Sequence, residues 1–194
     1  MSMDSLLDKR KCIIKSALDL VQEHGFHGCP VSMVAKNAGV ASGTIYTYFE
    51  NKDALIIGIY EYVVEEIKKY VSERDDNLSP FKDRFYTYWK SLTDFYELNP
   101  SIHGFYDQFL KSPFNSEDLQ KKPNAWHDYA NSFFEDGIKL GEIKELNPIV
   151  LSILVNTNVN SIVGIKKNFK KKLARNNMSL DEISHLIWDG IKAK

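Results

Sequence analysis

The sequence predicts an all-α protein, and three observations carry that prediction. Apolar residues recur three and four positions apart through most of the chain, which is the spacing of one helical face. Glycine and proline stand at the ends of these periodic segments, where they stop helices. No segment alternates between apolar and polar residues with the period of two that a half-buried strand requires.

The composition is typical of a soluble globular protein. The 194 residues are 43% hydrophobic and 26% charged, unlike collagen-like, disordered or membrane chains. The formal net charge of −1 gives no protein-wide attraction to nucleic acid. Any nucleic-acid site is therefore expected to be a local patch.

The sequence favours a cytoplasmic protein with no membrane partner. Cys12 and Cys29 are the only cysteines, which suits a reducing compartment better than a disulfide framework. Met1–Lys11 lacks the apolar run of a secretory signal. The longest apolar stretch, Ile149–Val163, is shorter than the about twenty residues that span a bilayer, and it is interrupted by Ser152, Asn156, Asn158 and Asn160. We expect it to form a buried helix.

Four helices are expected in the first third of the chain, at about 4–24, 31–38, 41–49 and 52–72. Gly25 and Gly39 can adopt the positive φ of a residue that follows a helix. Pro30 suits a first helical turn, where a missing N–H costs least. Asn51 can cap the fourth helix.

The rest of the chain is expected to form five more helices, at about 81–98, 100–111, 124–140, 148–167 and 179–193. Asn99-Pro100 and Asn147-Pro148 mark two of the helix starts. The segment 112–123 is polar and contains proline, so we expect it to be loose. We divide the chain into an N-terminal domain, 1–52, and a helical C-terminal domain, 53–194.

The segment Val34–Phe49 has the pattern of a helix-turn-helix. Two short periodic stretches flank a tight turn in which Gly39 stands where positive φ is needed. The apolar residues of both stretches can point into one small core with the first helix; they are Val34, Ala35, Ala38, Val40, Ile45 and Phe49.

The outward face of the second helix predicts a site for double-stranded DNA. If Ile45 and Phe49 are buried, an advance of about 100° per residue turns Gly43 and Thr47 outward. Small polar side chains can enter a major groove and offer hydroxyl and methyl groups to base edges, and tyrosines beside them can reach phosphates. Lys52 would lie at the start of the next helix, which favours a phosphate. The DNA-contacting residues are expected to be Ser42, Gly43, Thr44, Tyr46, Thr47, Tyr48 and Lys52.

The motifs of this region resemble those of the TetR family of bacterial transcriptional regulators, of the TetR/AcrR type. The matching residues are Gly25-Phe26, Val34-Ala35, Ala38-Gly39-Val40, the run Ser42-Gly43-Thr44-Ile45-Tyr46-Thr47-Tyr48-Phe49, and Lys52-Asp53-Ala54-Leu55. The resemblance spans about the first 55 residues. It implies a homodimer with a three-helix DNA-binding domain, an effector-binding body and a dimer interface made by the last two helices.

Two positions depart from the family pattern. Cys29-Pro30 stands where the family often has Thr-Thr, and Ala41 stands where it often has Ser. Both departures remove hydroxyl groups, and the missing threonine usually caps the second helix and can touch phosphate. We take Ser32 as its substitute in DNA binding.

Aromatic residues are dense between positions 81 and 134 and predict a site for a bulky apolar or aromatic effector. Helical proteins often bind such ligands between helices, in pockets lined by aromatic rings. The alternative is that these rings simply form the core. The candidate pocket residues are Trp89, Tyr96, Phe105 and Trp126.

The last two long helices are expected to form a four-helix interface with a second copy of the chain. The candidate interface residues are Ile153, Asn156, Asn160, Leu186 and Ile187. Asn156 and Asn160 lie four apart and could fix the register of the two protomers, although a solvated edge explains them equally well.

Other chemistries find little support in the sequence. His103 and Asp107 have a spacing that two metal ligands could use, but no further ligand motif accompanies them. There is no phosphate-binding glycine loop and no nucleophile motif. We expect no metal, no cofactor and no enzymatic activity.

Two functions from different classes lead, and a metabolic enzyme is a distant third option. The first is a ligand-responsive repressor that binds a palindromic operator as a homodimer, with the effector changing the spacing of recognition helices from about 34 Å. The second is a helical small-molecule-binding or interaction module with weak or vestigial DNA binding. The second is motivated by the charge of residues 1–52, which include six basic and five acidic side chains.

Overall fold

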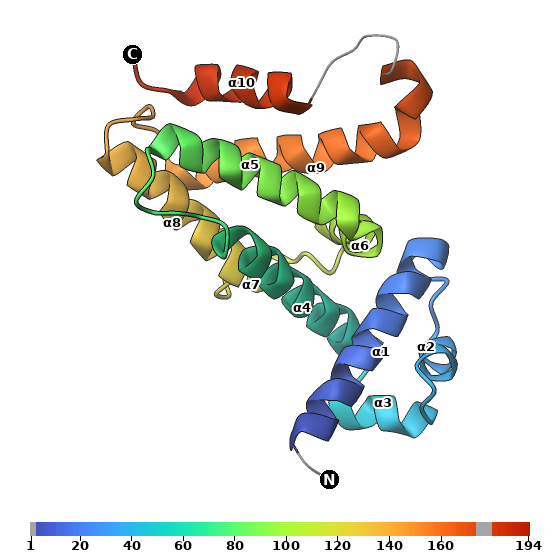
Figure 1. The fold of residues 1–194 in the computed structure, drawn as a ribbon. Coiled ribbons are helices and arrows are strands. Elements are labelled where there is room, and N and C mark those ends of the chain that lie inside the picture. Colours follow the sequence, from blue (N-terminus) through green and yellow to red (C-terminus); the bar gives the residue numbers. More distant parts are fainter. Residues whose placement is uncertain (1–2, 174–179) are drawn as a thin grey trace. The chain divides into compact units, whose positions relative to one another are not determined.

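The computed structural model describes the backbone of residues 3–173 and 180–194, and the side chains of residues 8–165 and 182–194. Within these ranges the protein is all-α, as predicted, with one isolated antiparallel bridge between Ile143 and Lys192. The helices, labelled in Figure 1, are α1 (Met3–His24), α2 (Val31–Asn37), α3 (Ser42–Tyr48), α4 (Lys52–Ser72), α5 (Phe81–Leu98), α6 (Pro100–Leu110), α7 (Glu117–Gln120), α8 (Ala125–Lys139), α9 (Pro148–Leu173) and α10 (Leu180–Ile191).

Most helices begin and end within two residues of their predicted bounds, because the expected stop signals act locally. Gly25 and Gly39 have φ of 68° and 66°, and Asn51 Oδ1 accepts a hydrogen bond from the Ala54 amide at 2.8 Å. Two expectations were wrong. The segment expected to be loose contains α7, and α9 continues beyond Lys167 to Leu173.

The chain packs as two compact units, which we describe separately. The first unit comprises residues 1–64 and 99–123, and the second comprises residues 65–98 and 124–194. The helices α6 and α7 therefore pack with the N-terminal helices, although they lie far from them in sequence. The predicted domains, 1–52 and 53–194, were divided by expected function and not by packing. That division stays a prediction.

The first unit is built around α1. The residues of its inner face are buried, and Ser16 Oγ donates a hydrogen bond to the Val34 carbonyl at 3.0 Å, which ties α1 to α2. On another side α6 packs against α1, where Ser101 Oγ donates to Asp19 Oδ1 at 2.9 Å. The buried inner-face residues are Ile14, Ala17, Leu18 and Val21.

The start of α4 packs closely on the end of α3. Gly58 lies so near the Phe49 ring that an added Cβ would stand 2.6 Å from Phe49 Cε1. The Arg10 guanidinium lies 5.3 Å from the centroid of the same ring. Phe49 thus links α1, α3 and α4 within this unit.

Replacing Gly58 by alanine is expected to destabilise the protein by about 1–2 kcal/mol, because a buried ring has to move to admit the methyl group. Urea unfolding measures the change. Gly43→Ala is the matched control, since a Cβ there meets nothing within 4 Å and alanine favours a helix by roughly 0.5–1 kcal/mol. Equal stabilisation by the two substitutions would contradict the close packing at Gly58.

The second unit has α5 at its centre, in contact with α9 and α10, while α8 packs on α9 (Figure 1). Aromatic rings fill the space between α5 and α8. The Tyr88 ring stacks on Phe133 and Trp126, with centroid distances of 4.6 and 5.6 Å. The Tyr88 hydroxyl donates a hydrogen bond to Asn156 Oδ1 of α9 at 2.7 Å.

A buried ion pair holds the segment before α5 to this unit. The Arg84 guanidinium donates two hydrogen bonds of 2.8 Å to the Asp75 carboxylate. Its face lies 5.2 Å from the centroid of Phe133. The hydrogen bonds from Arg84 to Asp75 raise the pKa of the guanidinium, so its charge is present and matched by a carboxylate.

One face of α9 is exposed and apolar. Leu151, Val155 and Val159 are buried, whereas Ile153 is 58% exposed and Val150 is similarly exposed. By length and composition alone the window Pro148–Ile165 is apolar enough to cross a bilayer, and a third of it is buried. The core helix of a soluble protein passes the same test, so this is weak evidence for a membrane span. The expectation of a buried helix is therefore confirmed for one face only. The apolar window also extends from Pro148 to Ile165, beyond the predicted stretch 149–163.

Candidate nucleic-acid interface

The turn between α2 and α3 has the geometry that the sequence predicted. Gly39 follows α2 with positive φ, and the Val40 amide donates to the Ala35 carbonyl at 3.0 Å. A residue with a Cβ is strained in this conformation. The turn therefore brings α3 against the core at a fixed angle.

The helix α3 buries one face and exposes the other. Ile45 is 1% exposed and Phe49 is also buried, whereas Tyr46 is 55% exposed. Thr44 and Tyr48 are half-buried at the flanks of the exposed face. The remaining predicted contact residues on α3 are exposed; they are Ser42, Gly43 and Thr47.

The exposed face of α3 is small as well as polar. Nothing lies within 4 Å of a Cβ built on Gly43, so the backbone there is open to a close approach. Thr47 Oγ1 donates to the Gly43 carbonyl at 3.3 Å, which turns the threonine methyl and hydroxyl along the helix surface. Such a surface is able to enter a DNA major groove.

The two positions that depart from the family pattern, Cys29-Pro30 and Ala41, leave α2 and α3 without side-chain caps. Pro30 and Ala41 occupy the N-cap positions, and neither side chain accepts a hydrogen bond. Ser32 lies in the first turn of α2 and is exposed, but it is not the cap. Its expected contact with DNA stays a prediction, as do the contacts of the α3 residues.

Lys52 begins α4 and is half-buried at the edge of this surface. Its ammonium group lies near enough to the buried Cys29 thiol to lower that pKa, although burial has the larger effect and raises the Cys29 pKa. A cation at a helix start adds to the attraction of the free backbone N–H groups for a phosphate. The first unit thus carries a localised positive group beside α3.

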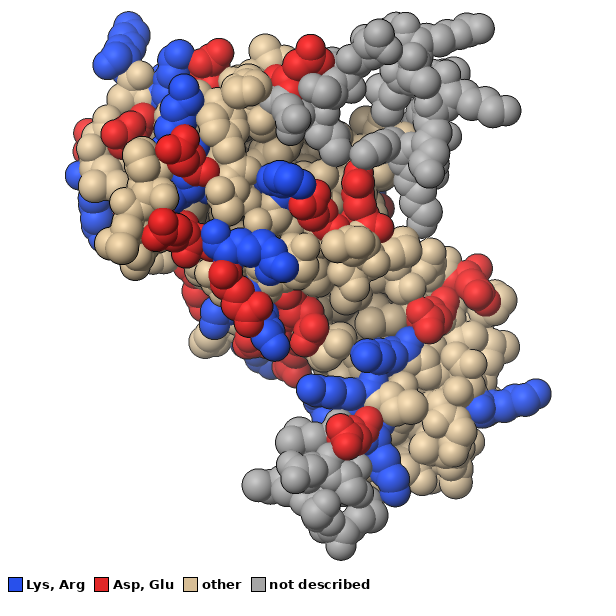
Figure 2. Space-filling model, in the orientation of Figure 1, with Lys and Arg blue, Asp and Glu red and all other residues tan. Residues whose placement is uncertain are grey.

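The charge of the N-terminal part, residues 1–52, is mixed. On the face that Figure 2 shows, Lys and Arg side chains are interspersed with Asp and Glu. This agrees with the nearly balanced charges of residues 1–52. Sequence-independent attraction to DNA is therefore expected to be modest for one protomer.

Replacing Lys52 by alanine is expected to weaken binding to all duplexes about two- to fivefold and to reduce the salt dependence of binding, because one phosphate contact per protomer is lost. Fluorescence anisotropy over a salt series measures both quantities. Lys69→Ala removes an exposed charge in the last turn of α4 and should change neither. An unchanged salt slope for Lys52→Ala would remove Lys52 from the interface.

The four candidate effector residues are all buried, but they do not share one unit. Trp89, Tyr96 and Trp126 belong to the second unit. Phe105 belongs to the first, where its ring lies 5.5 Å from that of Phe26. Aromatic density in the sequence could not show this separation, because it does not tell which helices pack together.

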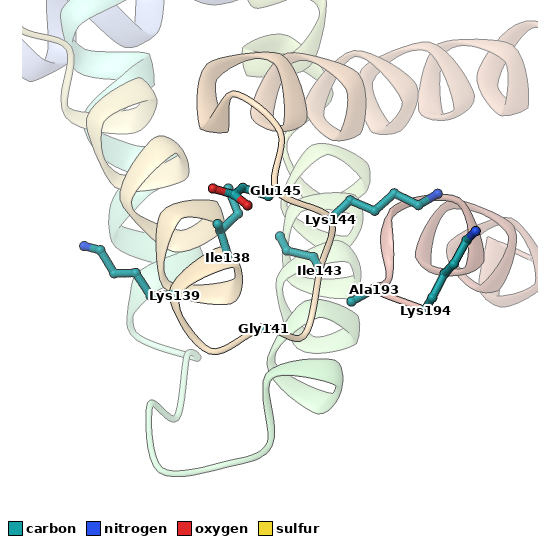
Figure 3. Close-up of a pocket in the computed structure, with 8 residues that line it drawn as sticks. All are labelled: Ile138, Lys139, Gly141, Ile143, Lys144, Glu145, Ala193 and Lys194. Atoms are coloured by element: carbon teal, nitrogen blue, oxygen red, sulfur yellow. The ribbon is translucent and has the colours of Figure 1, made fainter.

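A surface pocket of about 590 Å³ lies on the second unit, between the end of α8 and the segment after α10. Figure 3 shows its lining, which includes Lys139, Lys144 and Glu145. Lys144 Nζ donates to the Gly190 carbonyl, and Lys139 pairs with Glu135 at 3.2 Å. None of the candidate effector residues lines this pocket.

The candidate interface residues differ in where they point. Ile153 and Leu186 are 58% and 66% exposed, and Ile187 is half-buried. Asn160 is buried within the protomer, and Asn156 accepts the hydrogen bond from Tyr88. The register role expected for the two asparagines is not tested by these contacts and stays a prediction.

The described side chains contain no group of three residues able to hold a metal ion. Of the two residues with suitable spacing, His103 is buried and Asp107 pairs with Lys111 at 2.7 Å.

Comparison with known proteins places both parts of the chain in one family. Residues 13–59 match the profile described as bacterial regulatory proteins of the tetR family, and residues 80–192 match that of the tetracyclin repressor-like C-terminal domain. The second match alone covers more than half of the chain.

Curated relatives and solved structures agree with these matches. An HTH-type transcriptional regulator of Haemophilus influenzae is 31% identical over 73% of this chain and 74% of its own length. The fatty acid metabolism regulator protein of Bacillus subtilis is 29% identical over 69% of this chain and 70% of its own. The structure of the regulator FadR from Bacillus subtilis in complex with stearoyl-CoA covers 92% of this chain and 95% of its own, with a TM-score of 0.72 and 22% identity. The chain belongs to the TetR family of bacterial transcription regulators, whose members carry an N-terminal helix-turn-helix and a helical C-terminal domain.

Proposed function

We propose that this regulator acts in the cytoplasm as a homodimeric repressor that binds a palindromic operator through α3 and is released by a fatty-acyl effector. It has no enzymatic role in this proposal. The observation that carries it is the division of α3 into a buried apolar face and an exposed face of small polar residues. That division is what groove entry requires.

The dimer is supported by the exposed apolar face of α9. Val150, Ile153 and Leu154 are exposed along it, and Leu186 is exposed on α10. Large exposed apolar residues gathered on one helix face mark an interaction surface. A second copy that packs the same two helices against this face would bury these side chains and place two α3 helices on one duplex.

The fatty-acyl effector is supported by the similarity to the fatty acid metabolism regulator protein of Bacillus subtilis and to FadR in complex with stearoyl-CoA. The aromatic interior of the second unit supports it as well. Apolar ligands of this kind bind among buried rings with a few polar anchors. The effector-binding residues in this proposal are Trp89, Tyr96 and Trp126 of that unit. The role of Phe105 is to pack α6 onto the first unit beside Phe26.

Titration of stearoyl-CoA into a complex of the protein with operator DNA tests the effector. We expect fluorescence anisotropy of labelled DNA to fall as the acyl thioester is added, with free coenzyme A as the control. A ligand can shift the DNA-binding equilibrium only by its differential affinity for the two states. Release by coenzyme A alone, or no release at saturating stearoyl-CoA, would contradict the fatty-acyl effector while leaving DNA binding intact.

The second candidate is an effector-binding module with weak DNA binding, and the mixed charge of residues 1–52 favours it. The two candidates differ in salt dependence. A DNA-binding homodimer that neutralises several phosphates shows a steep fall in affinity between low and moderate salt. A flat dependence on random duplex would favour the second candidate.

A further inference from the structure

The interior of the second unit contains two buried hydrogen-bond donors that the protein leaves unmatched. Among the described residues, the indole Nε1 groups of Trp89 and Trp126 have no hydrogen-bond partner. Both side chains are buried, at 3% and 0% exposure. Indole N–H groups usually find a partner when they are buried, since an unmatched donor forfeits its hydrogen bonds to water.

The two indoles lie in an apolar, aromatic setting. The Trp126 ring stacks on Tyr88 and Tyr129, with centroid distances of 5.6 and 6.1 Å. The Trp89 ring lies 6.4 Å from that of Phe85. The rings packed around the two donors are therefore mainly carbon surface.

The same interior holds no unmatched positive charge among the described side chains. Among the described residues of this unit, Arg84 is the only buried lysine or arginine, and its Nε and Nη2 both donate to the Asp75 carboxylate, which matches its charge. Burial lowers the pKa of His127, which disfavours the charged form of its imidazole. A carboxylate buried beside Trp89 and Trp126 would thus lack a counter-ion, and burying an unpaired charge is costly.

From these contacts we infer that Trp89 and Trp126 donate hydrogen bonds to uncharged oxygen acceptors of the effector, as the thioester and amide carbonyls of an acyl thioester provide. The inference rests on the proposed effector-binding function of the second unit and names the groups that select the ligand. It distinguishes an acyl thioester or ester from a free fatty acid. The chain of the ligand contributes affinity through the rings, and the indoles contribute selectivity.

Binding of matched ligands to indole variants tests this inference. The probes are stearoyl-CoA, the thioether S-octadecyl-CoA, which lacks the carbonyl oxygen, and stearate. Trp89→Phe and Trp126→Phe keep an aromatic ring but remove the donor together with part of the ring surface, and each is expected to weaken stearoyl-CoA binding roughly three- to tenfold in calorimetry. The comparison of thioester with thioether separates the loss of the donor from the loss of ring surface. Stearate is expected to bind the unmodified protein more weakly than stearoyl-CoA.

Trp188→Phe is the control variant, because the Trp188 indole is not among the unmatched donors of the described residues. It should bind stearoyl-CoA as the unmodified protein does. The thioether should bind the unmodified protein more weakly than the thioester, and at least one of the two indole variants should lose that discrimination. Circular dichroism and urea unfolding confirm that each variant is folded.

Three results would overturn the inference. They are unchanged stearoyl-CoA affinity in both indole variants, equal losses for thioester and thioether, and no binding of stearoyl-CoA to the unmodified protein. Operator binding of each variant without ligand is measured in parallel. If DNA binding is retained, the first two results reject the assignment of the indoles alone, whereas the third also rejects the proposed fatty-acyl effector.

Discussion

Gly43→Glu is expected to abolish specific operator binding, with a loss of affinity greater than about 100-fold, while leaving the fold intact. The added side chain meets no protein atom within 4 Å of its Cβ, so α3 has room for it. In the groove it would place a carboxylate against base edges and phosphates, and a like-charge contact costs several kcal/mol. Anisotropy with labelled operator and circular dichroism together measure the two effects.

Leu78→Glu is the matched control for this substitution. It makes the same change in net charge at a residue that is 90% exposed and outside the helix-turn-helix. We expect it to weaken operator binding less than threefold, through the general field alone. If Gly43→Glu and Leu78→Glu lower affinity equally, α3 does not enter the groove.

Ile153→Glu is expected to raise the dissociation constant of the homodimer at least about 100-fold, because an unpaired charge would be buried in the interface. Operator affinity should fall with it, since a monomer engages only one half-site. Sedimentation velocity over a concentration series measures the oligomeric state. The monomer should remain folded, because Ile153 is exposed on the surface of the protomer.

Leu98→Glu is the control for the dimer prediction. Leu98 is also a large exposed apolar residue, but it ends α5 and lies off the exposed face of α9. Its substitution should leave the oligomeric state unchanged. A dimer that survives Ile153→Glu with unchanged affinity would place the interface elsewhere.

The helices could be predicted well because their ends depend on local signals. Gly25 and Gly39 have the positive φ that a chain leaving a helix adopts, and Asn51 caps α4 as its type suggests. The helix α7 was missed because its four residues carry no repeating apolar face. Its one signal was Ser116, whose hydroxyl accepts from the Leu119 amide at 3.3 Å.

The tertiary grouping could not be predicted, because periodicity shows that a face is buried but not what covers it. Phe105 belongs to a buried face of α6, yet its neighbour Phe26 is distant in sequence. Asn156 similarly has the spacing of an interface polar residue, while Tyr88 of α5 supplies a partner inside the protomer. Such pairings arise from the packing of helices that are far apart along the chain.

The candidate DNA surface could be predicted in more detail. Once two residues of a short helix are known to be buried, helical geometry fixes the direction in which each of the other side chains points. The prediction that Ile45 and Phe49 are buried is confirmed, and Tyr46 and Thr47 are exposed between them. The unmatched indole donors had no sequence signal. The type of residue was visible at Trp89 and Trp126, but the absence of an acceptor depends on the packing around each ring.

Selection of DNA from a random duplex pool by the purified protein, followed by sequencing, tests the proposed regulator most directly. We expect enrichment of a palindrome whose two half-sites are separated by about one helical turn, as a dimer with paired recognition helices requires. Recovery of a sequence without two-fold symmetry, or no enrichment by protein that is folded and dimeric, would contradict a homodimeric operator-binding repressor.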